Sequence, residues 1–510
     1  MNATAPIRTD WFDRWAVYSP DRIALTDQES GRSFSYAECN RIVNRLAGVL
    51  RNEYGVEAGE RIAVLSTNEV EYVFLFFASQ KLRSILVPIN YRLAPREIAH
   101  ILTDCAPVLF TCQRQFDETV QALPQSLREG MTTAAFDGHD SLTVRMFNES
   151  LSAEAIDQDA DFDTPVMVLY TSGTTGAPKG AVITHGMLFW NSVNTSMRLN
   201  LVQQDVTLTF APFFHTGGWN VLTTPFLHRG GHIILLKKFD PEQVLRLCDD
   251  AGVTILFGVP TMMDMMHRAA AFADASLASV RYAIVGGEPM PEALIRVWQE
   301  KGVPIRQGYG LTEFGPNVFS LNEEDAIRKI GSIGFPNFYI DTRVVDDAGK
   351  DVADGEVGEL LLRGPVCTPG YWNNPEATAA AIREGWMHTG DLVRRDDEGY
   401  FYVVDRKKDM FISGAENVYP AEIEHFLRSH PAVKSVAVVG VPDPRWGEVG
   451  RAFIVLHDDA TATAEEILEF CRGNLAKYKI PKYVVFIDAL PVSDSGKILK
   501  KQLREFDHAR

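Results

Sequence analysis

Hydrophobic residues follow helical and strand spacing in turn through the first part of the chain. Residues 36–51 have apolar side chains at helical spacing, and residues 61–66 form a short apolar run that predicts a buried strand. An apolar helix over residues 71–81 and a strand over 84–88 come next. This alternation is typical of βαβ units. We therefore expect an α/β fold with a largely parallel sheet.

A second series of buried strands begins after Thr164. The strand at 166–170 runs directly into a glycine-rich segment. Further strands are predicted at 206–210, 232–236, 254–257 and 282–285, with helices at 241–251 and 261–271. The α/β pattern therefore continues to about residue 285.

The pattern changes near Ile340. Residues 340–345 and 358–363 predict two strands separated by an acidic turn that contains glycine. Such a pair is typical of antiparallel sheet, and here it predicts a small barrel.

A charged cluster at residues 405–409 precedes a compact C-terminal segment. That segment predicts helices at 420–428 and 464–475 and strands at 433–439, 451–456 and 483–487. We expect an N-terminal domain over residues 1–405 and a small α+β domain over residues 406–510.

Charge and hydropathy narrow the classes of function. The chain has 510 residues and a formal net charge of -17, which argues against non-specific nucleic-acid binding because that requires a cationic surface. No apolar run reaches the roughly 18 residues of a membrane-spanning helix. Residues 1–10 lack the apolar core of a signal peptide. We therefore expect a cytoplasmic protein without an integral membrane segment.

The glycine-rich segment at 170–180, YTSGTTGAPKG, carries the strongest chemical signal. Glycines let backbone N–H groups approach an anion, and hydroxyl groups and a lysine add donors and positive charge. It lacks the Gly-Lys-Ser/Thr ending of a Walker A loop, so it predicts another kind of phosphate loop. The residues expected to hold phosphate are Thr171, Ser172, Gly173, Thr174, Thr175 and Lys179.

This segment resembles the signature of the adenylate-forming superfamily, which includes acyl-CoA synthetases, adenylation domains and luciferases. Segments similar to its other motifs follow in the expected order at 213–218, 286–289, 307–313, 388–391, 405–409 and 491–497. The resemblance is strongest to bacterial fatty-acyl-CoA ligases. It implies a large N-terminal domain of two α/β sandwich subdomains plus a small distorted β-barrel, and a small mobile α+β C-terminal domain.

The resemblance also implies roles for single residues in activating a carboxylate with ATP. Lys497 would stabilise the charge that develops as the carboxylate meets the α-phosphate. Glu313 would be the protein ligand of Mg²⁺, and Thr312 would contact the α-phosphate. Asp391 would accept hydrogen bonds from the ribose hydroxyls, with Arg406 beside the ribose or phosphate.

The remaining implied contacts concern adenine, coenzyme A and domain movement. Lys408 would be the hinge about which the small domain turns after adenylation. Residues expected at the adenine and phosphates are Gly287, Glu288, Gln307, Gly308 and Tyr309, and those expected at coenzyme A are Gly414 and Trp446.

The acyl pocket is expected around the 213–218 motif. His215 would plug the pocket or orient the carboxylate, and no acidic residue is present in FFHTGG to bind an α-amine. Trp219 would gate a tunnel. The other expected wall residues are Thr216, Gly217, Val221, Phe257, Gly286, Tyr309, Phe314, Gly315 and Pro316.

These features predict an ATP-dependent acyl-CoA ligase with Mg²⁺, ATP and coenzyme A as cofactor and cosubstrates. Carboxylate and ATP would give acyl-AMP and pyrophosphate, and the coenzyme A thiol would then give acyl-CoA and AMP. The expected acid is a medium- or long-chain fatty acid, and an aryl acid of the coumarate or benzoate type is the alternative.

Other readings of the same motifs stay open. They are a stand-alone adenylating enzyme with another acceptor, a phosphotransferase or hydrolysing NTPase, and a non-catalytic acyl or nucleotide sensor. A homodimer is also left open.

Overall fold

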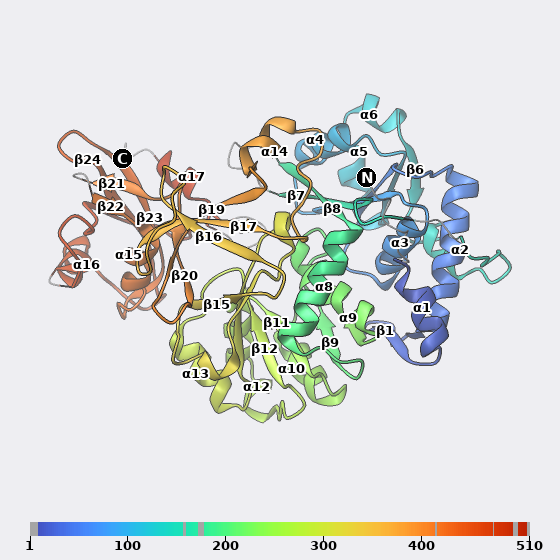
Figure 1. Ribbon diagram of the computed structural model, residues 1–510, viewed down its shortest axis with the longest axis horizontal. Coiled ribbons are helices and arrows are strands. Elements are labelled where there is room, and N and C mark those ends of the chain that lie inside the picture. The colour runs from blue at the N-terminus through green and yellow to red at the C-terminus, as the bar shows by residue number, and fades with distance from the viewer. Residues whose placement is uncertain are drawn as a thin grey trace. The chain divides into compact units, whose positions relative to one another are not determined.

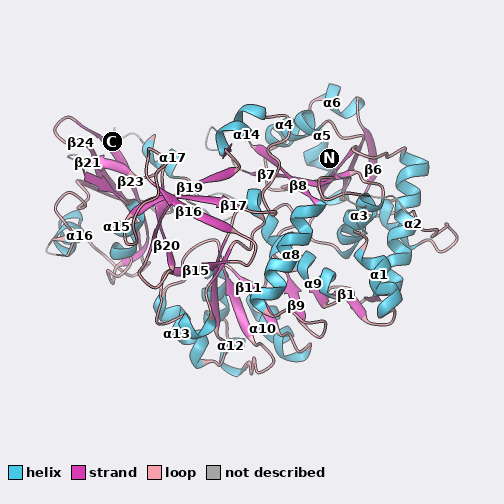
Figure 2. Cartoon of the chain, viewed as in Figure 1, coloured by secondary structure: helices cyan, strands magenta, loops and turns pink. Residues whose placement is uncertain are grey.

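The computed structural model describes residues 9–156, 160–171, 178–413, 416–472, 474–492 and 498–506. The chain divides into two compact units. The first contains Met1–Thr342 and Leu362–Met387, and the second contains Arg343–Leu361 and His388–Arg510. Figure 1 identifies the elements along the chain, and Figure 2 separates helices from strands. The predicted domain boundary between residues 405 and 406 stays a prediction.

The first unit contains a six-stranded sheet in the order β6-β5-β3-β4-β7-β8. Its strands are β3 (Arg61–Leu65), β4 (Ile85–Ile89), β5 (Leu109–Cys112), β6 (Thr132–Ala135), β7 (Pro165–Thr171) and β8 (Lys179–Thr184). The pairs are parallel except β7 with β8. Residues 62–65 of β3 are all buried, as expected for a parallel strand covered on both faces.

A second sheet of the same unit follows the order β15-β14-β13-β12-β11-β9-β10-β1-β2. Its strands are β1 (Ile23–Asp27), β2 (Ser33–Ser35), β9 (Val206–Thr209), β10 (His232–Leu235), β11 (Ile255–Gly258), β12 (Tyr282–Val285), β13 (Ile305–Tyr309), β14 (Phe319–Ser320) and β15 (Ser332–Pro336). The central strands from β13 to β1 are parallel. Antiparallel strands complete both ends.

Helices cover these sheets, and their ends follow local sequence. α2 (Tyr36–Tyr54) begins with a capping box between Ser35 and Glu38 and is capped at its C-terminus by Gly55, whose φ is 66°. α8 (His185–Leu199) packs along α9 (Thr223–Arg229), as Figure 1 shows. The other helices of the unit are α1 (Trp11–Tyr18), α3 (Val70–Lys81), α4 (Pro95–Cys105), α5 (Asp117–Gln121), α6 (Gln125–Glu129), α7 (Leu142–Phe147), α10 (Pro241–Asp250), α11 (Pro260–Arg268), α12 (Ala271–Asp274), α13 (Glu292–Glu300) and α14 (Pro375–Ala381).

The second unit combines an antiparallel layer with a small α+β region. β16 (Asp341–Val345), β17 (Val357–Arg363), β19 (Trp386–Arg395) and β20 (Phe401–Arg406) lie in that order, and the short β18 (Ile382–Arg383) pairs with β19. The second layer has the order β22-β21-β24-β23, with β25 beside β24. Its elements are β21 (Phe411–Ser413), β22 (Glu416–Val418), β23 (Val433–Asp443), β24 (Gly447–Leu456), β25 (Tyr483–Phe486), α15 (Pro420–Leu427), α16 (Ala464–Cys471) and α17 (Lys500–Arg504).

The predicted mixed α/β fold, with a large N-terminal part and a small C-terminal α+β part, is confirmed. The strands predicted from apolar runs are present within one or two residues, except that β23 continues to Asp443 and β24 begins four residues before the predicted start, at Gly447. None of the described helices is both long and apolar enough to span a bilayer.

Candidate active site

The glycine-rich segment starts and ends on paired strands of the first unit. Thr171 in β7 lies opposite Lys179 in β8, and the Thr171 hydroxyl donates to the Lys179 carbonyl oxygen at 3.4 Å. The predicted phosphate ligands between them, namely Ser172, Gly173, Thr174 and Thr175, lie outside the described residues. The antiparallel pairing therefore holds both ends of the segment side by side.

Lys179 and Glu313 are linked through Tyr371, which is not among the site residues predicted from the sequence. The Lys179 Nζ atom lies 5.6 Å from the centroid of the Tyr371 ring, and the Tyr371 hydroxyl donates to Glu313 Oε1 at 2.9 Å. Burial raises the pKa of the Tyr371 hydroxyl, and the neighbouring Glu313 carboxylate raises it further. Tyr371 therefore stays neutral and donates a hydrogen bond to the Glu313 carboxylate.

The segment around Tyr371 reaches this position because it pairs with β8. The backbone N–H of Trp372 donates to the Gly180 carbonyl at 2.7 Å, and the Thr368 N–H donates to the Glu313 carbonyl at 2.8 Å. Apart from an aromatic pair after Gly370, the sequence carries no local signal for this placement.

The chemistry of Glu313 fits a magnesium ligand. Glu313 is half-buried in the turn Thr312–Phe314, next to the predicted phosphate contact Thr312. Within the described part of the chain, no three His, Cys, Asp or Glu side chains form a metal-binding group. A single carboxylate suits Mg²⁺, which usually takes one or two protein oxygens together with substrate phosphates and water.

The predicted adenine-binding residues lie at the carboxyl ends of two neighbouring parallel strands, β12 and β13. The Gln307 amide donates to the Glu288 carbonyl at 3.1 Å and accepts from the Met290 N–H at 3.1 Å. A Cβ at Gly286 would lie 3.5 Å from the Gly308 carbonyl oxygen. Gln307 therefore holds the loop after β12 against the end of β13.

Three further residues near the ends of β12 and β13 have a specific backbone conformation or packing. Gly287 has a φ of +86°, which favours glycine. The Tyr309 ring packs edge to face on Phe319, with centroids 5.7 Å apart. Phe314 is fully buried.

The loop that carries His215 follows β9 and faces β11. The His215 N–H donates to the Pro212 carbonyl at 3.1 Å, and the Gly218 N–H donates to the His215 carbonyl at 3.0 Å. A Cβ at Gly217 would lie 3.9 Å from the Phe257 ring. His215, Thr216, Gly217 and Phe257, all predicted pocket residues, are thus neighbours in the structure.

Trp219 is fully buried in the hydrophobic core of the first unit. Its indole N–H donates to the Phe213 carbonyl at 2.6 Å, and its ring stacks on the Phe213 ring at 4.1 Å between centroids. Tyr72 and Phe76 enclose it further. The packing by itself accounts for a tryptophan here, and the gating role stays a prediction.

A buried polar face of α8 adjoins the predicted acyl wall. The Asn191 Nδ2 donates to the Asn220 carbonyl at 2.7 Å. A Cβ at Gly315, whose φ is +58°, would lie 3.2 Å from Asn191 Oδ1. The Asn317 Nδ2 donates to the Thr195 hydroxyl at 2.6 Å and to the same Asn220 carbonyl at 3.3 Å. Neither Asn191 nor Asn317 is among the residues predicted from the sequence.

The predicted ribose ligands belong to the second unit and are bonded to each other. Asp391 in β19 pairs with Arg406 in β20, and Arg406 Nε lies 2.5 Å from Asp391 Oδ1. Asp391 is only 2% exposed, and Arg406 is about half exposed. The arginine neutralises a buried carboxylate and fixes its orientation.

Lys408 follows β20 on the surface of the second unit. Its carbonyl accepts from the Arg504 guanidinium at 3.2 Å, and Arg504 also pairs with Asp409 at 2.8 Å. Nearby, the buried Asp405 accepts from the Ala421 N–H at the start of α15 at 2.9 Å, and burial raises its pKa. The hinge role of Lys408 stays a prediction.

The predicted coenzyme A contact Trp446 is 47% exposed between β23 and β24. The Asp443 carboxylate accepts from the N–H groups of Arg445 and Trp446, both at 2.9 Å, and pairs with Lys482 at 2.5 Å. Gly414 and Lys497 lie outside the described residues, although Val492 and Ile498 on either side of residues 493–497 pair with each other.

Two protein-family models together match most of the chain. The family described as "AMP-binding enzyme" matches residues 12–372, and "AMP-binding enzyme C-terminal domain" matches residues 422–497.

Similar proteins carry the names of CoA ligases. A feruloyl-CoA synthase from Amycolatopsis sp is 40% identical, over 97% of this chain and 98% of its own length. An indoleacetate–CoA ligase from Aromatoleum aromaticum is 38% identical over 98% and 97%. A long-chain-fatty-acid–CoA ligase from Mycobacterium tuberculosis is 38% identical over 96% of both chains.

Among solved structures, ATP-bound MatB from Rhodopseudomonas palustris is similar, with a TM-score of 0.90. The two chains are 32% identical over 98% of this chain and 99% of that chain.

Proposed function

The chain belongs to the AMP-binding enzyme family, as an AMP-forming acyl-CoA synthetase, and we propose that its acid is aromatic and carries a polar group far from the carboxylate. In the first half-reaction a carboxylate oxygen bonds to the α-phosphorus of ATP and pyrophosphate leaves. In the second, the sulfur of coenzyme A bonds to the acyl carbon, AMP leaves, and the thiol proton is released.

One observation carries this choice of acid, namely the amide of Asn191 beside the predicted acyl wall. Asn191 is 2% exposed, and its Oδ1 has no hydrogen-bond partner among the residues that the structure describes. The amide orientation is defined, because a flipped group would bring two carbonyl oxygens together at Asn220. A buried, unpaired acceptor costs about 1–3 kcal/mol, and a substrate hydroxyl or amine would remove that cost.

Neighbouring residues add to the polar character of this wall. Asn337 is buried, and its Oδ1 also lacks a partner within the described residues, while its Nδ2 donates to the Asn317 carbonyl at 2.8 Å. A long alkyl chain would offer these buried amides no hydrogen bond. The named acids of the relatives include feruloyl and indoleacetate groups, which support an aromatic acid, and also long-chain fatty acids.

The predicted site residues take the following roles in this proposal. Glu313, oriented by Tyr371, would hold Mg²⁺, which supplies positive charge to the phosphate oxygens when bound. Asp391 would accept hydrogen bonds from the ribose hydroxyls, and Arg406, 2.5 Å from Asp391 Oδ1, would fix the orientation of its carboxylate. Lys497 would stabilise the charge that develops between the carboxylate and the α-phosphate.

An acid panel tests the proposal. We expect AMP and pyrophosphate from ATP, coenzyme A and a hydroxylated cinnamic or indole-type acid, with a higher kcat/KM than for a straight-chain fatty acid of equal carbon number. In wild type, the hydroxylated acid should exceed its unsubstituted analogue by roughly 10- to 100-fold, the factor that corresponds to one buried hydrogen-bonding group.

Asn191→Ala should reduce that ratio toward one. Asn44 in α2 provides a matched control, since it is also buried and its Oδ1 also lacks a partner in the described chain. Asn44→Ala should leave the ratio unchanged. A fatty acid as the best substrate, or an unchanged ratio in Asn191→Ala, would contradict an aromatic polar acid.

A further inference from the structure

Asn68 bonds to the loop that carries His215 from a different sheet. Its Nδ2 donates to the Ala211 carbonyl at 2.9 Å, and its Oδ1 accepts from the Phe213 N–H at 3.0 Å. Asn68 follows β3 of the six-stranded sheet, whereas Ala211 and Phe213 follow β9 of the other sheet. The amide therefore pairs with the loop backbone as a neighbouring strand would.

Close packing and a hydrogen bond at Gly218 also restrain the other end of the loop that carries His215. Gly218 packs so closely that a Cβ there would lie 2.4 Å from the Pro212 carbonyl oxygen. The Thr223 hydroxyl donates to the Gly218 carbonyl at 2.6 Å. Since the loop is bonded at both ends, a shift at Phe213 would move His215, two residues later.

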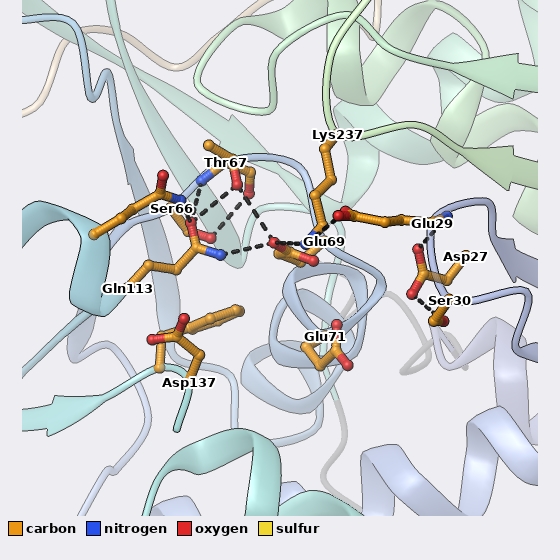
Figure 3. Close-up of polar contacts among 12 residues, drawn as sticks. Asp27, Glu29, Ser30, Ser66, Thr67, Glu69, Glu71, Gln113, Asp137 and Lys237 are labelled. Atoms are coloured by element: carbon orange, nitrogen blue, oxygen red, sulfur yellow. Dashed lines mark hydrogen bonds and ion pairs between the residues drawn. The ribbon is translucent and has the colours of Figure 1, made fainter. Parts of the chain in front are cut away.

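Asn68 is fixed by polar contacts on both sides. The preceding Thr67 N–H donates to Gln113 Oε1 at 2.8 Å, and Gln113 Nε2 donates to Glu69 Oε1 at 2.7 Å. Lys237 Nζ pairs with the same Glu69 oxygen at 3.1 Å and with Glu29 at 2.8 Å. Figure 3 shows the Glu69 carboxylate between Gln113 and Lys237.

This network joins the carboxyl ends of strands from both sheets. Gln113 follows β5, Lys237 follows β10 and Glu29 follows β1. Glu69 is 9% exposed, and burial raises its pKa, while Lys237 and the Gln113 hydrogen bond oppose that shift. Lys237 therefore compensates a carboxylate that would otherwise be costly to bury.

We propose that Asn68, held by the Glu69–Lys237–Gln113 network, is a positioning residue that sets the His215 loop for the acid substrate. This role rests on the proposed placement of the acid against His215 and Gly217. Asn68 touches loop backbone and not the reacting atoms, so it acts through the loop and on the acid more than on ATP.

The test measures the KM for the acid and for ATP separately, by pyrophosphate exchange with whichever acid wild type uses best. Asn68→Ala should raise the KM for the acid about 10-fold, the factor expected for losing two buried backbone hydrogen bonds. The KM for ATP should change less than about twofold. Asn68→Asp retains the acceptor for Phe213 but places a carboxylate oxygen against the Ala211 carbonyl, so it should raise the KM for the acid as well.

Asn40→Ala is the matched control, because Asn40 accepts from Lys81 at 3.2 Å in the same unit. It should leave both KM values unchanged. Values of KM do not depend on the folded fraction, so partial unfolding of a variant does not obscure the result. Equal changes in both KM values, or none, for Asn68→Ala and Asn68→Asp would overturn the positioning role. If a fatty acid is the best substrate, the proposed acid class fails, yet the KM comparison still decides the role of Asn68.

Discussion

At the scale of single residues, a hydrogen bond joins the side chains of Tyr371 and Glu313, which are 58 positions apart in the sequence. The Tyr371 hydroxyl donates to one Glu313 oxygen, which leaves the other oxygen for a metal ion. The Tyr371 ring also lies beneath the Lys179 ammonium, a favourable cation–π arrangement. One side chain thus orients both predicted charges of the phosphate region in this unit.

Tyr371→Phe should therefore slow adenylation by about fivefold, because one hydrogen bond of about 1 kcal/mol is lost, while Glu313→Gln should slow it by about 100-fold. Pyrophosphate exchange at several Mg²⁺ concentrations measures both, and Glu313→Gln should require more Mg²⁺. Tyr36→Phe is the control, since the Tyr36 hydroxyl donates to the Gly231 carbonyl at 2.7 Å in the same unit. An equal loss in Tyr371→Phe and Tyr36→Phe would argue against the Tyr371 role.

At the scale of elements, the turn after β13 depends on close backbone packing. A Cβ at Gly310 would lie 1.8 Å from the Pro316 carbonyl oxygen, and that atom belongs to backbone, which cannot swing aside. The turn between these residues carries Thr312 and Glu313. Glycine at 310 is therefore required for the geometry of the predicted metal and phosphate contacts.

We expect Gly310→Ala to destabilise the protein by about 1–3 kcal/mol, as overpacking does, and to reduce adenylation more than stability alone explains. Gly48 offers a contrast inside α2, where the nearest atom to a new Cβ is 4.0 Å away. Gly48→Ala should stabilise by about 0.5–1 kcal/mol and leave activity intact. Urea unfolding and pyrophosphate exchange measure the two effects. Full activity in Gly310→Ala would show that the turn relaxes freely.

At the scale of the whole molecule, buried histidines couple stability to pH. Burial lowers the pKa values of His185, His228 and His232 to about 4. In the unfolded chain a histidine has a pKa of about 6.5. The unfolded state therefore binds more protons than the folded state between these values, and acid favours unfolding.

The free energy of unfolding should thus be highest above about pH 6.5 and fall as the pH drops toward 4. Each such histidine contributes a slope of up to about 1.4 kcal/mol per pH unit. Urea unfolding at several pH values across this range measures how the free energy of unfolding changes with pH. His185→Asn should reduce this slope by the contribution of one histidine. A stability that stays constant from pH 7 to pH 4.5 would contradict this origin.

Much of the fold was predictable because its signals are local. Apolar runs mark strands such as β3 and β12, since a parallel strand buried on both faces needs them. Motif order predicted the roles of Thr171, Glu313 and Asp391, and the structure describes the surroundings of each. The functions of these residues stay predictions. The buried polar face of α8 was not predicted, since Asn191 and Thr195 resemble exposed helix positions until their partners are known.

The sequence by itself determined the α/β class, the order of the elements and the net acidic charge, because spacing and composition are properties of the chain alone, and its ordered motifs carried the resemblance to acyl-CoA ligases. Only the tertiary structure decided that Tyr371 bonds to Glu313, that Asn68 bonds to the His215 loop, and that Trp219 lies in the core. Such contacts join segments that approach only when the sheets form and pack, so no local pattern encodes them.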